Sequence, residues 1–131
     1  GKMCLLDRVI AWDDQHIACQ STAHRDPDNP LRQDGRLGAL AAIEFAAQAM
    51  AVHGRLAGAI GERPRAGIIA SLRDINCRCA RLDQFESALE ISATKLMGDE
   101  HSVMYAFAVS CGAQELVTGR ATVVLQAEIP T

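Results

Sequence analysis

The sequence lacks a basic excess, an acidic tail and any strongly apolar run. Asp and Glu (16) outnumber Lys and Arg (13), which gives a net charge of −3, and the charges are scattered along the chain. Without a basic patch there is nothing to pair with a phosphate backbone, so nucleic acid is not an expected partner. The longest apolar run, residues 37–52, is interrupted by Glu44 and Gln48 and is mostly alanine. It is too short and too weakly hydrophobic to span a membrane.

The number of cysteines is odd, so they cannot all pair within the chain, and no signal peptide is recognisable. These two observations predict reduced thiols and a cytoplasmic location. Cys77 and Cys79 have the wrong spacing for the usual zinc or redox pairs, so we expect no metal site there. The five cysteines are Cys4, Cys19, Cys77, Cys79 and Cys111.

Repeats, low-complexity tracts and linkers are missing as well. The 131 residues therefore predict a single domain over residues 1–131. A chain of this length buries roughly two thirds of its unfolded surface and needs no disulfide to fold.

The first half of the chain predicts two strands, a loop and one helix. Residues 3–23 are typical of extended structure with a turn at Asp13-Asp14, and the prolines and glycine of residues 27–35 end these strands. Residues 37–53 are rich in helix formers and carry one formal charge, which predicts a helix buried on most sides. We expect Asp34 as its N-cap and Gly54 or Gly58 at its end.

The second half changes from helical to alternating periodicity. After a loop, "GERPRAG", residues 68–79 are strand-like but the alternation changes parity, which indicates a bulge. Residues 89–93, 103–111 and 117–125 alternate regularly and predict three consecutive antiparallel strands. One apolar helix with such a sheet predicts an α+β fold in which the sheet curls round the helix. A symmetric dimer would protect the sheet's edges.

Two residues in this framework are candidates for chemistry. Glu44 and Gln48 lie one turn apart on the same helix face among alanines, where a partly desolvated carboxylate would have the raised pKa of a general acid. The alternative is that Glu44, Gln48 and His53 form a solvated stripe. His24 lies in a polar loop, where a histidine is either a general base or an ordinary turn residue. The residues alone leave both pairs of alternatives open.

Particular stretches resemble a known enzyme family. "LLDRV", "HRDPDNPLRQDG" and a buried helix with "EFAAQ" resemble the 3-hydroxyacyl-acyl-carrier-protein dehydratases of fatty acid synthesis. The segments "HRDPDNPLR" and "AAIEFAAQAMAVHG" are similar to segments of the dehydratase-like proteins of bacterial aryl polyene clusters. The resemblance implies the hotdog fold, in which a curved antiparallel sheet wraps a long central helix and two subunits join as a homodimer or heterodimer.

The resemblance also implies a reaction, the elimination of water from a 3-hydroxyacyl thioester on an acyl carrier protein or coenzyme A. His24 would take the C2 proton, and Glu44 of the partner subunit would protonate the departing hydroxyl. Gln48 would orient Glu44, and a backbone N–H of Gly35 or Gly38 would polarise the thioester carbonyl. No metal or cofactor is implied.

Two other functions stay open at this point. The loop departs from the dehydratase pattern at Arg25 and Asp34, and the separation of His24 from Glu44 is longer. These departures motivate a second hypothesis, a non-catalytic subunit that completes a heterodimeric dehydratase. A third is an acyl thioesterase, because hotdog folds host both chemistries.

Overall fold

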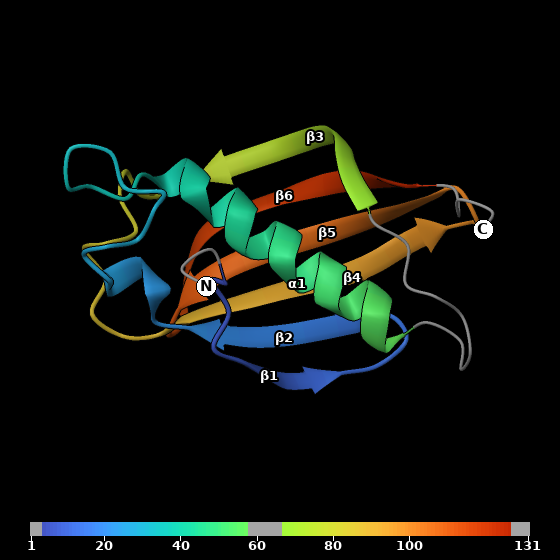
Figure 1. Ribbon diagram of the computed structural model, residues 1–131, viewed down its shortest axis with the longest axis horizontal. Helices are drawn as coiled ribbons and strands as arrows, with labels where there is room; N and C mark the ends of the chain where they lie inside the picture. Colours follow the sequence, from blue (N-terminus) through green and yellow to red (C-terminus); the bar gives the residue numbers. More distant parts are fainter. Residues whose placement is uncertain (1–3, 58–66, 127–131) are drawn as a thin grey trace.

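The computed structural model describes residues 4–57 and 67–126, which form one antiparallel sheet and one long helix. The six strands lie in the order β1-β2-β4-β5-β6-β3. The helix α1 crosses one face of this sheet, with the edge strands β1 and β3 on either side of it (Figure 1). The elements are β1 Arg8–Trp12, β2 His16–Ser21, α1 Ala42–Leu56, β3 Gly67–Cys77, β4 Leu89–Gly98, β5 Ser102–Cys111 and β6 Gln114–Leu125.

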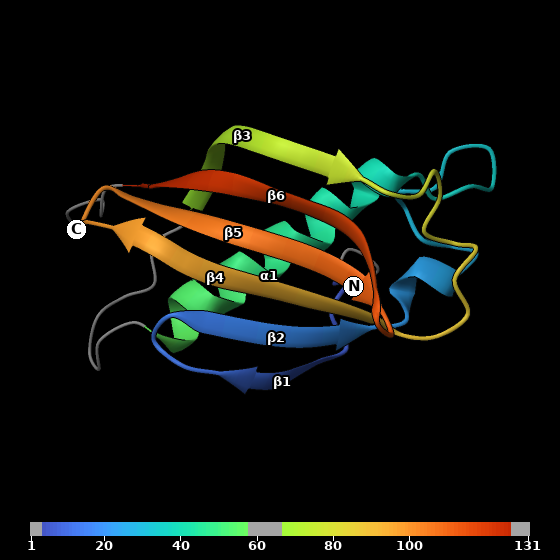
Figure 2. The ribbon, with the colours of Figure 1, turned by 180° about the vertical axis from the view of Figure 1, so that it is seen from behind.

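This arrangement confirms the predicted α+β fold and the predicted order of elements. β1 and β2 pair as an antiparallel hairpin, and the Asp13 N–H and the His16 carbonyl close its turn at 2.8 Å. The view from behind shows the opposite face of the sheet, and no helix of the described residues covers it (Figure 2). None of the helices in the described residues is long and apolar enough to cross a membrane.

The core lies between α1 and the covered face of the sheet. The alternation predicted for β4 and β5 places every second side chain in it, because successive side chains of a strand point to opposite faces. Phe45 from α1 packs in the same cluster. Its buried members from these elements include Leu89, Ile91, Ala93, Tyr105, Phe107, Val109, Ala42, Ala46, Ala49 and Met50.

β3 has the parity change that residues 68–79 predicted. Its pairing with β6 shifts register between Ile69 and Ser71 and again between Arg73 and Asn76. Asp74, inside the second shift, has a φ of 55°, a left-handed conformation typical of bulges and turns. The preceding loop prediction concerns residues 61–67, of which only Gly67 lies among the described residues.

The start of the helix differs from the prediction. Asp34 is not an N-cap, because Asp34 and Gly35 form the tip of a tight hairpin with φ angles of 53° and 75°. Gln33 and Arg36 close it with backbone bonds of 2.9 and 3.0 Å, the geometry of a type I′ turn. The helix begins later, with a 3-10 turn at Ala39–Ala41 that leads into α1. At the other end Gly54 lies within α1, so its prediction as the helix stop is wrong, and Gly58 is outside the described residues.

The burial of α1 is also more one-sided than predicted. The single chain covers the side that faces the sheet, whereas Glu44 on the opposite side is exposed. Leu40, just before α1, leaves 65% of its surface exposed. The scarcity of charge on this helix is therefore not explained by burial within one chain.

Candidate active site

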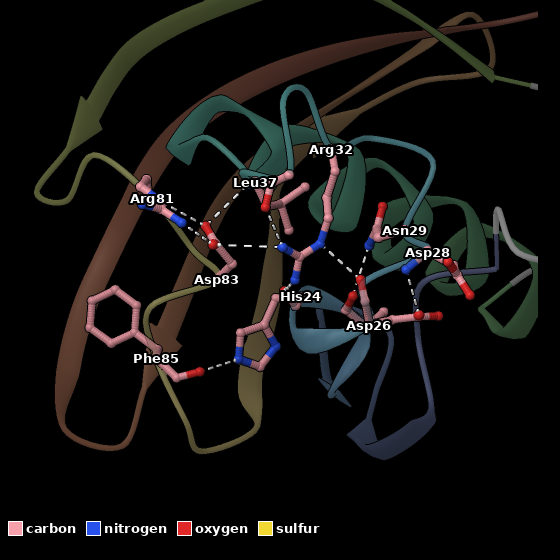
Figure 3. A network of polar contacts seen from close by, with 11 residues as sticks. His24, Asp26, Asp28, Asn29, Arg32, Leu37, Arg81, Asp83 and Phe85 are labelled. Carbon is pink, nitrogen blue, oxygen red and sulfur yellow. Dashed lines mark hydrogen bonds and ion pairs between the residues drawn. The ribbon is translucent and has the colours of Figure 1, made fainter.

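His24 is fully buried in a 3-10 turn, Ala23–Arg25, that follows β2. Its Nε2 lies 2.8 Å from the carbonyl oxygen of Phe85 (Figure 3). A carbonyl only accepts hydrogen bonds, so Nε2 carries the proton of the neutral ring. Nδ1 is then unprotonated, and it is the one buried side-chain nitrogen or oxygen among the described residues that has no hydrogen-bond partner. A buried acceptor without a donor costs folding free energy, and its lone pair is free to accept a proton. Both properties are those expected of a general base.

The surroundings of His24 keep its ring neutral. Burial is the largest influence and lowers the pKa of His24, because the charged ring loses its hydration. The backbone groups of Phe85 and, more weakly, Ser87 oppose this effect, whereas the positive charges of Arg25 and Arg32 lower the pKa further. At neutral pH His24 is therefore the free imidazole, the form that accepts a proton.

The loop after His24 is held by its own polar side chains. The Asn29 amide donates to the carbonyl of Ala23 at 2.8 Å, and only 5% of Asn29 is exposed. The Arg32 guanidinium donates from three different nitrogens, and its acceptors are the carbonyls of Asp26 (2.8 Å), Gly35 (2.7 Å) and His24 (3.1 Å). Residues 25–35, which depart from the dehydratase pattern, are thus an ordered support for His24.

Asp83 ties this loop to the approach to the helix. One carboxylate oxygen accepts the Leu37 N–H at 3.0 Å, and the other lies 3.7 Å from Arg32 Nη1. Arg81 donates to both oxygens, at 3.1 and 2.5 Å (Figure 3). The Arg81 guanidinium is the main reason that the pKa of Asp83 is lowered from 3.8 to about 2; burial opposes this effect and the Leu37 N–H adds to it.

This lowered pKa predicts how the fold responds to acid. A carboxylate whose pKa is lower in the folded than in the unfolded chain stabilises the fold above the unfolded value, and the contribution is lost as the pH falls towards the folded value. The window for Asp83 thus runs from about pH 4 down to about pH 2. In urea unfolding, wild type should lose on the order of 1 kcal/mol more than Asp83→Asn across this window. An equal loss in both proteins would contradict the assignment.

Gly38 lies where the chain enters the helix. Residues on either side of it pair with the segment that follows β3: the Ala39 N–H donates to Ala80 at 3.0 Å and the Leu82 N–H donates to Leu37 at 2.8 Å. In this bridge the N–H of Gly38 points away from the paired segment. A Cβ built on Gly38 would meet no atom within 4 Å, so the space beside it is open. Gly35, the other candidate donor, lies at the tip of the hairpin described above.

Glu44 and Gln48 have different environments. Glu44 is exposed on the first turn of α1, on the side away from the sheet. The Oε1 of Gln48 accepts the N–H of Leu5 at 2.7 Å, which fastens the N-terminal segment to α1. Its orienting role toward Glu44 stays a prediction. His53, the third member of the predicted solvated stripe, is buried instead.

His53 is a structural residue at the far end of the helix. Tyr105 donates its hydroxyl to Nδ1 at 2.8 Å, and Nε2 donates to the carbonyl of Asp13 at 2.9 Å. Both ring nitrogens are therefore satisfied, whereas in His24 only Nε2 has a partner. Burial also raises the pKa of the Tyr105 hydroxyl, which keeps it protonated as a donor.

The site includes residues that the sequence did not indicate. Arg32, Asp83 and the carbonyl of Phe85 hold His24 and the helix entrance, and no local pattern distinguishes them, because they act across long sequence separations. In residues 4–57 and 67–126, no three His, Cys, Asp or Glu side chains gather as a metal site.

Comparisons with known proteins agree on a family. A model of the ApeP-like family, described as ApeP dehydratase, matches residues 1–130. The dehydratase heterocomplex ApeI:P from Xenorhabdus doucetiae contains a chain that is 31% identical, with a TM-score of 0.81 over 98% of this chain and 86% of that one. No curated protein sequence matches.

More distant solved structures share the fold alone. A hypothetical thioesterase from Streptococcus pneumoniae TIGR4, solved with coenzyme A, is 11% identical with a TM-score of 0.67 over 94% of this chain and 88% of that one. AziG from S. sahachiroi is 9% identical with a TM-score of 0.69 over 96% and 94% of the two chains.

Proposed function

This chain belongs to the ApeP-like dehydratase family, and we propose that it eliminates water from a 3-hydroxyacyl thioester to give a trans-2-enoyl thioester. The observation that carries the proposal is the buried, neutral His24 whose Nδ1 has no partner. The thioester arrives on an acyl carrier protein or on coenzyme A. The chain acts with a second hotdog subunit, either a copy of itself or a different chain.

In the substrate the C2–H and C3–O bonds break and the C2=C3 double bond forms, while one proton goes to the base and another comes from the acid. Nδ1 of His24 takes the proton from C2, and the electron pair of that C–H bond forms the C2=C3 double bond. The 3-hydroxyl leaves as water with a proton from a carboxylic acid on the facing subunit, Glu44 in a homodimer. The backbone N–H of Gly38 stabilises the negative charge on the thioester oxygen, which the N-terminal end of the helix also favours.

Exposure of Glu44 supports a site shared between two subunits. A second subunit on the uncovered side of α1 would remove water from the Glu44 carboxyl group, and loss of hydration favours the uncharged form that can donate a proton. Leu40 is 65% exposed on this side, and the edge strand β3 exposes 56% of Ile68 and 40% of Leu72. A second subunit that covers these groups also accounts for the low charge of the helix.

The proposal is tested by the products that the assembled complex makes. The purified chain and its second hotdog subunit are incubated with a 3-hydroxyacyl thioester, and both the enoyl thioester and free thiol are measured. We expect enoyl thioester without release of thiol. Release of thiol alone would favour the thioesterase, and full activity that depends only on residues of the second subunit would make this chain a structural partner.

The lowered pKa of His24 predicts the acid side of the pH profile. The base works only when unprotonated, so kcat/KM should fall as the pH drops through the pKa of His24. Because that pKa is lowered from 6.5, the midpoint of the decline should lie below pH 6.5. A profile of kcat/KM against pH in which the midpoint of the decline lies at or above 6.5 would contradict this assignment.

A further inference from the structure

One short segment after β3 touches both halves of the proposed site. Phe85 fixes the ring of His24 through its carbonyl, and two residues earlier Asp83 accepts the N–H of Leu37, beside Gly38. Arg32 completes the connection, since it donates to the carbonyl of His24 and lies 3.7 Å from Asp83. The side chains of Arg32 and Asp83 are 14% and 7% exposed, so water competes little for them.

We propose that Arg32 and Asp83 are a positioning pair that sets the separation between the His24 ring and the N–H of Gly38. The inference rests on the proposed dehydratase function. Neither side chain needs to touch substrate; each acts through the backbone that it holds. In Figure 3 the Arg32 guanidinium lies between the loop carbonyls and the carboxylate of Asp83.

The chemistry of the pair explains why these residue types are needed. A guanidinium is a rigid planar fork, and the one on Arg32 donates from three nitrogens to three separate carbonyls. A lysine keeps the positive charge, but its single ammonium group cannot donate hydrogen bonds in the three directions of the guanidinium. Asp83 accepts the Leu37 N–H with one oxygen and turns the other towards the Arg32 charge, while Arg81 donates to both oxygens and holds the carboxylate in place. A misplacement of ~1 Å between reacting groups costs on the order of 100-fold in rate.

Three variants separate geometry from charge. Arg32→Lys and Asp83→Asn should each lower kcat by about 10-fold to 100-fold with a change in KM of less than about threefold. Arg32→Lys keeps the positive charge, so the acid side of its pH profile should stay in place. Arg25→Gln is the matched control, because Arg25 also lowers the pKa of His24 but donates only to the Glu86 carbonyl, at 3.0 Å. It should move the acid side upward without loosening the contact between Asp83 and the Leu37 N–H.

The closing experiment adds a readout that does not depend on activity. Rates are expressed per folded molecule, and hydrogen exchange of the Leu37 amide is measured by NMR in the same complexes. We expect exchange at Leu37 to speed up at least about 10-fold in Asp83→Asn and in Arg32→Lys, and not in Arg25→Gln. Unchanged exchange in both variants, or kcat within twofold of wild type, would overturn the positioning role. A fully active His24→Ala would instead reject the proposed function, and exchange at Leu37 would still decide the role of the pair.

Discussion

Replacing His24 with alanine should lower kcat for dehydration by at least about 100-fold, and by up to about 10,000-fold, the range that a general base contributes. The variant loses the only buried side-chain nitrogen or oxygen without a hydrogen-bond partner among the described residues, and the ring fills a fully buried position. The measurement is the rate of formation of enoyl thioester by a complex whose second subunit has been inactivated at its own site.

A second histidine provides the control. His16 is half-buried at the start of β2, where its Nδ1 lies 3.0 Å from the Thr94 hydroxyl. Because that contact is remote from the helix entrance, His16→Gln should keep at least half of the wild-type rate. If His24→Ala retained as much activity as His16→Gln, His24 would not be the base.

Replacing Glu44 with glutamine should remove the proton donor and lower kcat by at least about 100-fold. The change preserves size and polarity, and Glu44 is exposed in the single chain. The free energy of unfolding should therefore stay the same. Glu90→Gln, an exposed change on β4, is the matched control and should be neutral. A Glu44→Gln complex as active as Glu90→Gln would reject the role of Glu44.

The same two variants test whether a homodimer shares its sites. Mixed dimers of His24→Ala and Glu44→Gln chains contain one site with both residues intact. Random mixing should thus restore roughly a quarter of wild-type activity from two inactive proteins, because half the dimers are mixed and half their sites work. Failure to recover activity in a sample that contains mixed dimers would place the two residues in one subunit.

The regular part of the fold was predictable because it depends on local periodicity. Alternation in β4 and β5 and the alanine-rich composition of α1 identified the elements and their order. The helix start was not predictable, since Asp is favoured both as an N-cap and in a left-handed turn, and the Asp34-Gly35 hairpin is fixed by tertiary context. The exposed side of α1 was misread for a different reason: a low content of charge is typical of a buried face, and it is equally typical of a face that a second subunit would cover, as we propose here.

The candidate site was predictable only in part. The resemblance gave His24 and Glu44 as candidates, whose roles stay predictions, but the groups that hold His24 come from far along the chain. Phe85 and His24 are separated by 61 positions, and Asp83 and Leu37 by 46. Contacts of this kind use backbone carbonyls and N–H groups, which every residue except proline carries, so a single sequence contains no signal for them.

The most direct test of the account is the uptake of deuterium at C2. Hydration of an enoyl thioester in D2O reverses the proposed reaction, and the base that removes the C2 proton then delivers a deuteron to C2. Mass spectrometry should find one deuterium at C2 of the product with wild type. With His24→Ala, in a complex whose second subunit is inactive, this uptake should fall at least about 100-fold. Uptake at the wild-type rate in that complex would show that His24 does not transfer the proton and would contradict the account.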